Sequence, residues 1–164
     1  MDLLVFTLDD QRFALPVGVV HETLAAVAVT PLPAAPVVVD GVIDVRGDVV
    51  PVYDLHVRFG REPRPIRASE HFVLADAGNR MVALRVDRVQ ELIQVAAHDV
   101  TGARPDDPRM RHVAGVVRLP DGIALLQDLS AFLSQAEAAT LDSALRERAD
   151  RTSAAPDAGG QEGT

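Results

Sequence analysis

The chain has 164 residues, a formal net charge of −8, no cysteine and no tryptophan. Without cysteine it can form neither a disulfide framework nor a thiolate metal site. Its acidic balance and the lack of a basic stripe argue against a nucleic-acid-binding protein. Its length suits one domain, or two small halves that share an interface. The core must be mainly aliphatic, because aromatic residues make up only 4% of the chain.

No apolar run reaches the roughly 18 residues that a membrane-spanning helix needs. The first residues also lack the basic region of a signal peptide. We therefore expect a soluble, cytoplasmic protein. Because valine is frequent, strands are favoured over helices.

The first 36 residues predict strands separated by turns. Residues 3–8 and 12–15 form a hairpin around a polar turn, and a short helical turn is expected at 17–20. Another strand spans 23–29. The proline-rich bend at 30–36 prevents regular structure and leads to the next hairpin.

Residues 41–55 predict a hairpin of two strands rich in β-branched residues, with a tight turn in which Gly47 permits a positive φ. A similar hairpin follows at 115–129. Both begin with Gly, turn at a polar step that contains Gly, and end with Asp-Leu. We interpret Asp54 and Asp128 in these Asp-Leu pairs as structural caps that close the hairpins.

After 61–67, a charged segment with two prolines, the strand pattern begins again. Residues 69–75 and 80–86 predict a hairpin whose turn contains Gly and Asn. A further strand is expected at 92–95, followed by a loop at 101–109. We interpret 61–67 as the connection between two halves of the molecule.

The two halves repeat each other in sequence. At an offset of 69, Ala14, Leu15, Val17, Val20 and Glu22 match Ala83, Leu84, Val86, Val89 and Glu91. At an offset of 74, Gly41, Val42, Asp54 and Leu55 match Gly115, Val116, Asp128 and Leu129. The preserved order predicts two similar β subdomains, about 14–65 and 70–128, each a small barrel-like sheet.

A C-terminal helix is expected over 129–150, which completes a single domain over 1–150. Asp128 or Ser130 is its candidate N-cap. Its apolar residues recur at helical spacing: Leu129, Phe132, Leu133, Ala136, Leu141, Ala144 and Leu145. The segment 151–164 has no apolar periodicity, and we expect it to be a disordered tail.

The sequence contains no strong catalytic or cofactor signature. None of its five histidines forms an H-x-x-x-H or H-E-x-x-H pair, and no G-x-S-x-G or phosphate-binding glycine loop occurs. Asp54 and His56 could supply two metal ligands, but Asp-Leu recurs at 128–129 without a histidine, which favours the cap. A hydrolase that uses His21 or His56 with nearby carboxylates is a weaker hypothesis. We therefore predict no catalytic residue, no metal and no cofactor.

Glu22 and Arg46 lie among apolar strand and turn residues, and both are expected on the exposed face of the first sheet. They could be solvated charges, or a pair that neutralises itself and contributes little. Alternatively, they could form a charged rim around an aliphatic binding patch, where Arg is favoured. Spacing alone leaves both interpretations open.

Several motifs occur together in a defined order: Val5-Phe6-Thr7-Leu8, Phe13-Ala14-Leu15-Pro16-Val17, Val20-His21-Glu22, Pro33-Ala34-Ala35-Pro36, residues 41–55, and the segment from Gly115-Val116 to Asp128-Leu129. In combination they resemble the CheW-like domain family over roughly residues 2–135. The resemblance implies a mainly β fold of two SH3-like five-stranded β-barrel subdomains packed around a shared core. The predicted C-terminal α-helix is added to this fold.

The resemblance also implies a function, that of a non-enzymatic adaptor that couples chemoreceptors to a CheA-type histidine kinase. Its partners would be the regulatory domain of the kinase and the cytoplasmic tip of the receptor, in cytoplasmic arrays held at the membrane by the receptors. Carried over by motif, the partner-binding positions are Val20, Glu22, Gly41, Arg46 and Gly47. Arg46, in its Arg-Gly turn, is the strongest of them.

Two departures from the family pattern concern the partners. Asp44 stands where the family often has Asn, and His56 stands where it often has a basic residue. The chain could therefore serve a divergent motility, pilus or developmental chemosensory pathway. A small-barrel nucleic-acid-binding protein is an alternative of another class, against which the acidic charge argues.

Overall fold

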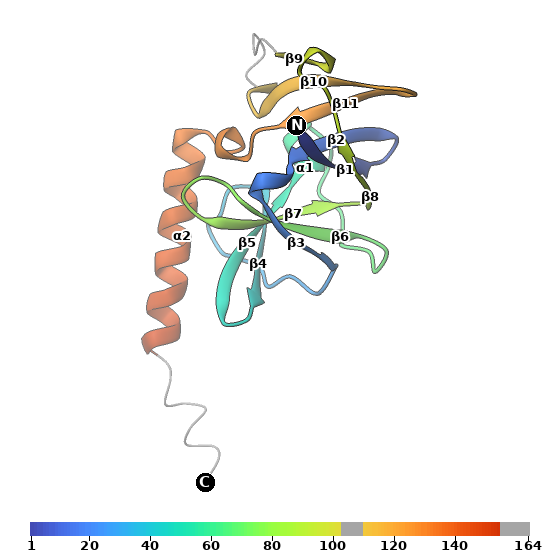
Figure 1. Cartoon of the computed structure of the whole chain (residues 1–164). Coiled ribbons are helices and arrows are strands. Elements are labelled where there is room, and N and C mark those ends of the chain that lie inside the picture. The colour runs from blue at the N-terminus through green and yellow to red at the C-terminus, as the bar shows by residue number, and fades with distance from the viewer. Residues whose placement is uncertain (103–109, 155–164) are drawn as a thin grey trace.

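The computed structural model describes residues 1–102 and 110–154, which fold into two β-sheets and a long C-terminal helix (Figure 1). Six strands form sheet A in the order β8-β1-β2-β11-β10-β9, and five form sheet B in the order β3-β6-β7-β5-β4. The prediction of a mainly β fold with two SH3-like subdomains and a C-terminal helix is confirmed. Among the residues that the structure describes, continuous strand pairing closes neither sheet into a barrel.

The chain enters sheet A first, then forms all of sheet B, and then returns to sheet A. Sheet A contains β1 (Asp2–Leu8), β2 (Gln11–Pro16), β8 (Arg88–Gln94), β9 (Val100–Gly102), β10 (Val113–Leu119) and β11 (Gly122–Gln127). Sheet B contains β3 (Val20–Ala25), β4 (Val39–Val45), β5 (Asp48–Asp54), β6 (His71–Asp76) and β7 (Met81–Val86). Three short helices lie between strands, η1 (Val17–Val19), α1 (Leu55–Arg58) and η2 (Ala97–Asp99), and η4 (Leu129–Ala131) follows β11.

All four predicted hairpins are present, as β1–β2, β4–β5, β6–β7 and β10–β11. Each has a short turn with the polar or glycine residues that tight turns need. The strand expected at 23–29 starts earlier, at Val20, and ends at Ala25. The strand expected at 92–95 is β8, which also starts earlier.

The predicted subdomain boundaries, 14–65 and 70–128, are wrong because the two halves of the chain exchange strands. Each half begins with a hairpin, β1–β2 in the first half and β6–β7 in the second. After this hairpin the chain crosses to the other sheet, where the remaining strands of the same half pair. Sheet A therefore combines β1–β2 with β8 and β10–β11, and sheet B combines β6–β7 with β3 and β4–β5. The segment 61–67 joins the two sequence halves by connecting α1, which follows β5 of sheet B, to β6 of the same sheet.

The exchange preserves the sequence repeat. Parallel pairing joins the halves within each sheet: Leu126 of β11 lies opposite Ala14 of β2, and Val52 of β5 lies opposite Ala83 of β7. These two pairs are equivalent in the sequence repeat, because position 126 corresponds to position 52 at the offset of 74 and position 83 corresponds to position 14 at the offset of 69. The two sheets are therefore built on one plan, and the repeat in sequence is also a repeat in structure.

One apolar core joins the two sheets and the C-terminal helix. It includes Phe6 and Leu15 of sheet A, Leu84 of sheet B, Phe132 and Leu141, each at most 1% exposed. Each sheet also encloses a smaller, mainly aliphatic cluster of its own. The shared core that the family resemblance implies is thus present.

Asp54 and Asp128 cap the short helices that follow the two equivalent hairpins. The Asp54 carboxylate accepts hydrogen bonds from the backbone N–H groups of His56 and Val57 at the start of α1. The Asp128 carboxylate accepts one from the N–H of Ser130 in η4. The interpretation of the Asp-Leu pairs as structural caps is confirmed.

The C-terminal helix, α2 (Gln135–Ala154), begins and ends later than the predicted 129–150. Its N-cap is Ser134, whose hydroxyl accepts a hydrogen bond from the Glu137 N–H at 3.1 Å, while the Glu137 carboxylate accepts one from the Ser134 N–H at 2.9 Å. This is a capping box. Residues 151–154, predicted to be disordered, belong to α2, and 155–164 lie outside the described residues, as do 103–109 of the loop expected at 101–109.

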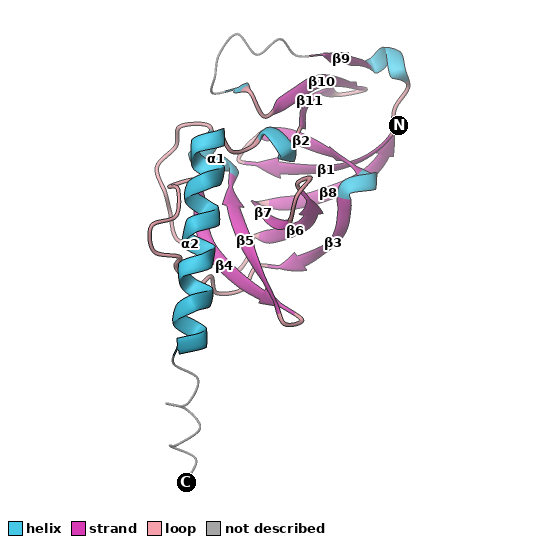
Figure 2. Ribbon diagram, turned by 90° about the vertical axis from the view of Figure 1, so that its left-hand side faces the viewer, coloured by secondary structure: helices cyan, strands magenta, loops and turns pink. Residues whose placement is uncertain are grey.

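The helix α2 runs along sheet B (Figure 2) and is attached to the rest of the molecule by ion pairs. Arg58 of α1 lies 2.8 Å from Glu137, and Arg80 forms an ion pair with Asp142. These pairs orient α2 over its apolar contacts with the shared core. Within the described part of the chain, no helix combines the length and the apolar character needed to cross a membrane.

Candidate partner-binding surface

Glu22 and Arg46 form an ion pair between the two ends of sheet B. Glu22 lies on β3 and Arg46 lies in the β4–β5 turn, and the sheet curls so that the guanidinium group meets the carboxylate. The hydrogen bond and the charge of Glu22 raise the pKa of Arg46. The Arg46 side chain is nevertheless 72% exposed. Of the interpretations left open by the sequence, the mutual pair is present, and its arginine stays accessible.

The β4–β5 turn fixes the backbone from which Arg46 projects. Val45 pairs with Asp48, so Arg46 and Gly47 are the two turn residues. Both have positive φ, 51° and 91°, as a type I′ turn requires. The Asp44 carboxylate accepts a hydrogen bond of 2.8 Å from the Gly47 N–H. Gly47 thus has the predicted backbone role, whereas the positive φ of Arg46 was not anticipated.

Gly41, another predicted partner-binding residue, is buried and allows two backbone segments to approach closely. A Cβ atom at this position would overlap the carbonyl oxygen of Thr30, which forms a bridge to Val42. The equivalent Gly115 in sheet A has the same role, because a Cβ there would lie 2.8 Å from the Thr101 carbonyl oxygen. Gly41 therefore has a backbone role in this conformation, and its part in partner binding stays a prediction.

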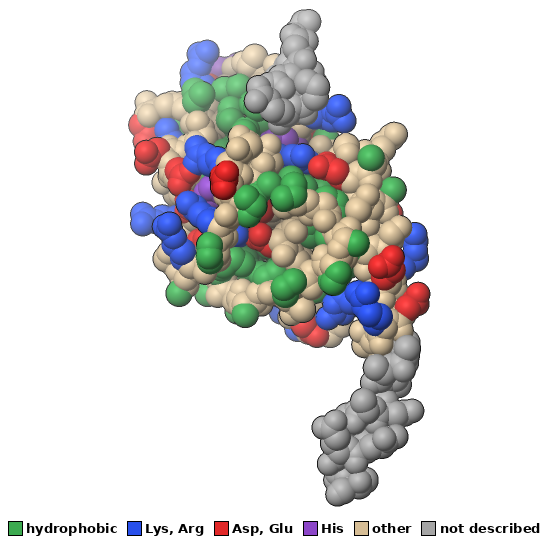
Figure 3. Space-filling model, turned by 180° about the vertical axis from the view of Figure 1, so that it is seen from behind, with side chains coloured by type: hydrophobic (Ala, Val, Ile, Leu, Met, Phe, Trp, Pro, Cys, Tyr) green, Lys and Arg blue, Asp and Glu red, His purple; other side chains and the backbone are tan. Residues whose placement is uncertain are grey.

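Val20, the remaining predicted residue, lies half-buried at the start of β3 and packs against the shared core. It shares this strand with Glu22. An exposed apolar residue also follows the β4–β5 turn, since Val49 is 44% exposed. Figure 3 shows apolar side chains gathered in patches between charged ones on the back of the molecule. Such mixed surfaces are typical of protein interfaces.

A groove of about 320 Å³ runs between the two sheets. Strands β2 and β11 of sheet A form one wall, and the β6–β7 turn of sheet B forms the other. The short helix η4, which follows β11, lies between the two walls. Its apolar lining includes Pro16, Val19, Ala77 and Leu129, and polar groups of Asp76, Gln127, Asp128 and Ser130 also line it. Its lining is mostly apolar, so it suits an apolar segment of a partner better than a charged small molecule.

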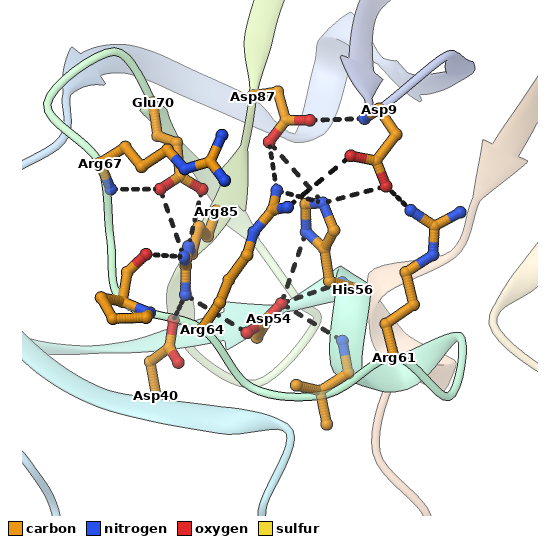
Figure 4. Close-up of polar contacts among 12 residues, drawn as sticks. Asp9, Asp40, Asp54, His56, Arg61, Arg64, Arg67, Glu70, Arg85 and Asp87 are labelled. Carbon is orange, nitrogen blue, oxygen red and sulfur yellow. Dashed lines mark hydrogen bonds and ion pairs between the residues drawn. The ribbon is translucent and has the colours of Figure 1, made fainter.

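Arg85 of β7 is buried among three carboxylates (Figure 4). Its Nε donates to Glu70 at 2.9 Å, its Nη1 donates to Asp40 at 3.0 Å, and Asp54 lies 3.4 Å from the same nitrogen. Burial, followed by the charge of Asp54, raises the pKa of Asp40. The sequence did not reveal this cluster, because its members come from four segments and Arg85 interrupts an otherwise apolar strand.

A second set of charges, here called the seam cluster, joins the two sheets. It consists of Asp9 from the β1–β2 turn, His56 of α1, Arg61 and Arg64 from the next segment, and Asp87 between β7 and β8. Arg61 pairs with Asp9, and Arg64 Nη2 lies 2.7 Å from His56 Nε2 and 3.1 Å from Asp87. Burial and the charge of Arg64 lower the pKa of His56.

The seam cluster consists of Arg–Asp ion pairs around His56. Asp9, His56 and Asp87 bring oxygen and nitrogen atoms within 4.8 Å of one another, an arrangement that attracts a cation. The two arginines of the cluster already supply that positive charge. The hydrolase hypothesis, which used His56 or His21, gains no support from these contacts, because they neutralise charge and do not activate a nucleophile.

A model of the CheW-like domain matches residues 2–137. The chain belongs to the CheW-like domain family. Its fold is similar to the crystal structure of the scaffolding protein TtCheW from Thermoanaerobacter tengcongensis, with a TM-score of 0.71 and 26% sequence identity. That similarity covers 77% of this chain and 87% of TtCheW. The family resemblance predicted from the motifs is therefore confirmed.

Two relatives show the same similarity in sequence. The chemotaxis protein CheW of Rhizobium meliloti (strain 1021) is 32% identical over 99 residues, which cover 60% of this chain and 64% of that protein. The probable chemotaxis protein CheW of Rhizobium etli is 28% identical over 138 residues, which cover 83% of this chain and 89% of that protein. The CheW-like chain thus matches just under two thirds of the first relative and most of the second.

Proposed function

We propose that this CheW-like protein is a non-enzymatic adaptor that couples chemoreceptors to a CheA-type histidine kinase in bacterial chemotaxis. The observation that carries the proposal is the family match over residues 2–137, which spans every strand of both sheets. The similar TtCheW is named a scaffolding protein, and the relatives are named chemotaxis proteins. The clustered charges pair with one another, which suits a binding protein.

The surface proposed to bind the kinase contains four of the predicted residues: Val20, Glu22, Arg46 and Gly47. The ion pair and the type I′ turn hold the Arg46 side chain in place, so less conformational entropy is lost when it binds. A planar guanidinium suits a carboxylate or a backbone carbonyl of the partner. Gly41 supports this surface only indirectly, through its close approach to Thr30.

The groove between the sheets is proposed to bind the cytoplasmic tip of the receptor. Its apolar walls, which include Pro16 and Val19, suit side chains from one face of an amphipathic helix. The kinase surface and the groove would then bind two partners at once. The adaptor would work in the cytoplasm, held at the membrane through the receptors. Repetition in an array would strengthen contacts that are individually modest.

A pull-down with purified full-length protein tests the coupling role. The baits are the regulatory domain of a CheA-type kinase and a receptor cytoplasmic tip, and wild type is expected to retain both. Arg46→Glu places a second carboxylate beside Glu22, so we expect its affinity for the kinase domain to fall at least tenfold. Arg118→Glu, the same charge change at an exposed position on β10, is the matched control and should bind like wild type.

Each outcome of the pull-down addresses a different part of the proposal. If wild type binds neither bait, the coupling role is wrong, although the family assignment stands. If Arg46→Glu binds like Arg118→Glu, the kinase surface lies elsewhere. Baits from motility, pilus and developmental pathways decide which pathway is served. Retention on DNA or RNA that weakens with salt would instead favour the nucleic-acid-binding alternative.

A further inference from the structure

The sequence repeat gives the molecule two equivalent seams between its sheets. Residue 9 corresponds to residue 78 at the offset of 69, and residue 56 corresponds to residue 130 at the offset of 74. In both seams a turn residue with positive φ faces a short helix: Asp9 (φ 52°) faces His56, and Gly78 (φ 104°) faces Ser130. The seam at Gly78 is the open groove, whereas the seam at Asp9 holds the seam cluster (Figure 4).

The contact between Arg64 and His56 in the seam cluster requires a neutral imidazole ring. Arginine can only donate hydrogen bonds, so His56 Nε2, which lies 2.7 Å from Arg64 Nη2, must be the unprotonated acceptor. The ring proton then resides on Nδ1. The same Arg64 nitrogen lies 3.1 Å from an Asp87 oxygen. Protonation would turn Nε2 into a donor and place a second positive charge against the guanidinium group, so this contact would be lost.

We propose that the seam cluster is an acid-sensitive latch between the two sheets, closed by neutral His56 and released when His56 takes up a proton. Arg64 ties the 61–67 segment to Asp87, where the chain crosses into sheet A. Arg61 ties the same segment to Asp9 in the β1–β2 turn of sheet A. Release of Arg64 therefore loosens this segment from the other sheet. The latch does not depend on the proposed coupling function.

The surroundings of His56 set the pH range of the latch. Three carboxylates and three arginines surround it: Asp9, Asp54, Asp87, Arg61, Arg64 and Arg85. Burial and the arginines outweigh the carboxylates, so the pKa of His56 lies below its ordinary value of 6.5. An opened seam would restore that ordinary value. The closed state is therefore fully favoured above pH 6.5 and loses stability as the pH falls through the lowered pKa.

An NMR titration of the full-length protein tests the protonation step. We expect His56 to titrate below 6.5 in wild type. Urea unfolding at pH 7 and pH 5 should show a smaller loss of stability in His56→Gln, because its amide oxygen can accept from Arg64 and gains no proton. His98→Gln, at a side chain that is 84% exposed, is the control and should keep the wild-type pH dependence.

Distance measurements test whether protonation opens the seam. Because the chain has no cysteine, spin labels at Asp10→Cys and Glu62→Cys, two exposed positions on opposite sides of the seam, report only this distance. The distance should lengthen on acidification in the wild-type background and stay constant with His56→Gln added. A pKa at or above 6.5 in wild type, or an unchanged distance while His56 titrates, would overturn the latch.

Discussion

At the scale of single residues, the structure separates positions that are open to a partner from positions that build the surface. The motif resemblance assigned Gly41 and Arg46 to the same role. Arg46 is highly exposed, whereas Gly41 is buried against the Thr30 carbonyl group. The sequence could indicate that both residues matter for one surface. It could not show that Gly41 acts through backbone approach, because the close contact depends on the segment between β3 and β4 folding back so that Thr30 bridges to Val42.

Gly41→Ala should therefore lower stability as well as any binding. We expect the free energy of unfolding to fall by about 1–3 kcal/mol, because the new methyl group must displace backbone atoms. Gly18→Ala is the matched control, since nothing lies within 4 Å of a Cβ there. Urea unfolding followed by circular dichroism measures both. Equal midpoints for the two variants would mean that the contact with Thr30 does not constrain position 41.

At the scale of elements, local signals predicted most of the fold. Hairpins and the Asp-Leu caps were recognised because β-branched residues, turn glycines and capping aspartates act on their immediate neighbours. The start of α2 was misplaced because Leu129 and Phe132 continue its helical spacing although they belong to η4 and the link that follows. The decisive signal, Ser134 three residues before Glu137, was present in the sequence.

Ser134→Ala should weaken the start of α2. Loss of the N-cap hydroxyl is expected to cost about 1 kcal/mol of stability and to speed hydrogen exchange of the Glu137 amide. The Ser143→Ala variant, changed at an exposed site inside the same helix, should exchange and unfold like wild type. If the two variants behaved alike, the helix would start without help from its capping box.

At the scale of the whole molecule, the sequence revealed the repeat but not the exchange of strands. Equivalent strands from the two halves have similar patterns, so each would fit either sheet, and no local signal decides which one it joins. The assignment depends on two crossings, through η1 and through Asp87. The charged clusters around Arg85 and His56 were missed for the same reason, since residues distant in sequence assemble them.

Because each sheet contains strands from both halves, the two sheets should unfold as one unit. Native-state hydrogen exchange in urea is expected to give one free energy of opening for the central amides of both sheets. Val117→Ala, in the buried cluster of sheet A, should lower that free energy by about 1–3 kcal/mol in sheet B as well as in sheet A. Val49→Ala, at an exposed site, is the control and should change neither. If Val117→Ala lowered protection in sheet A alone, the shared core and the exchanged strands would not couple the two sheets.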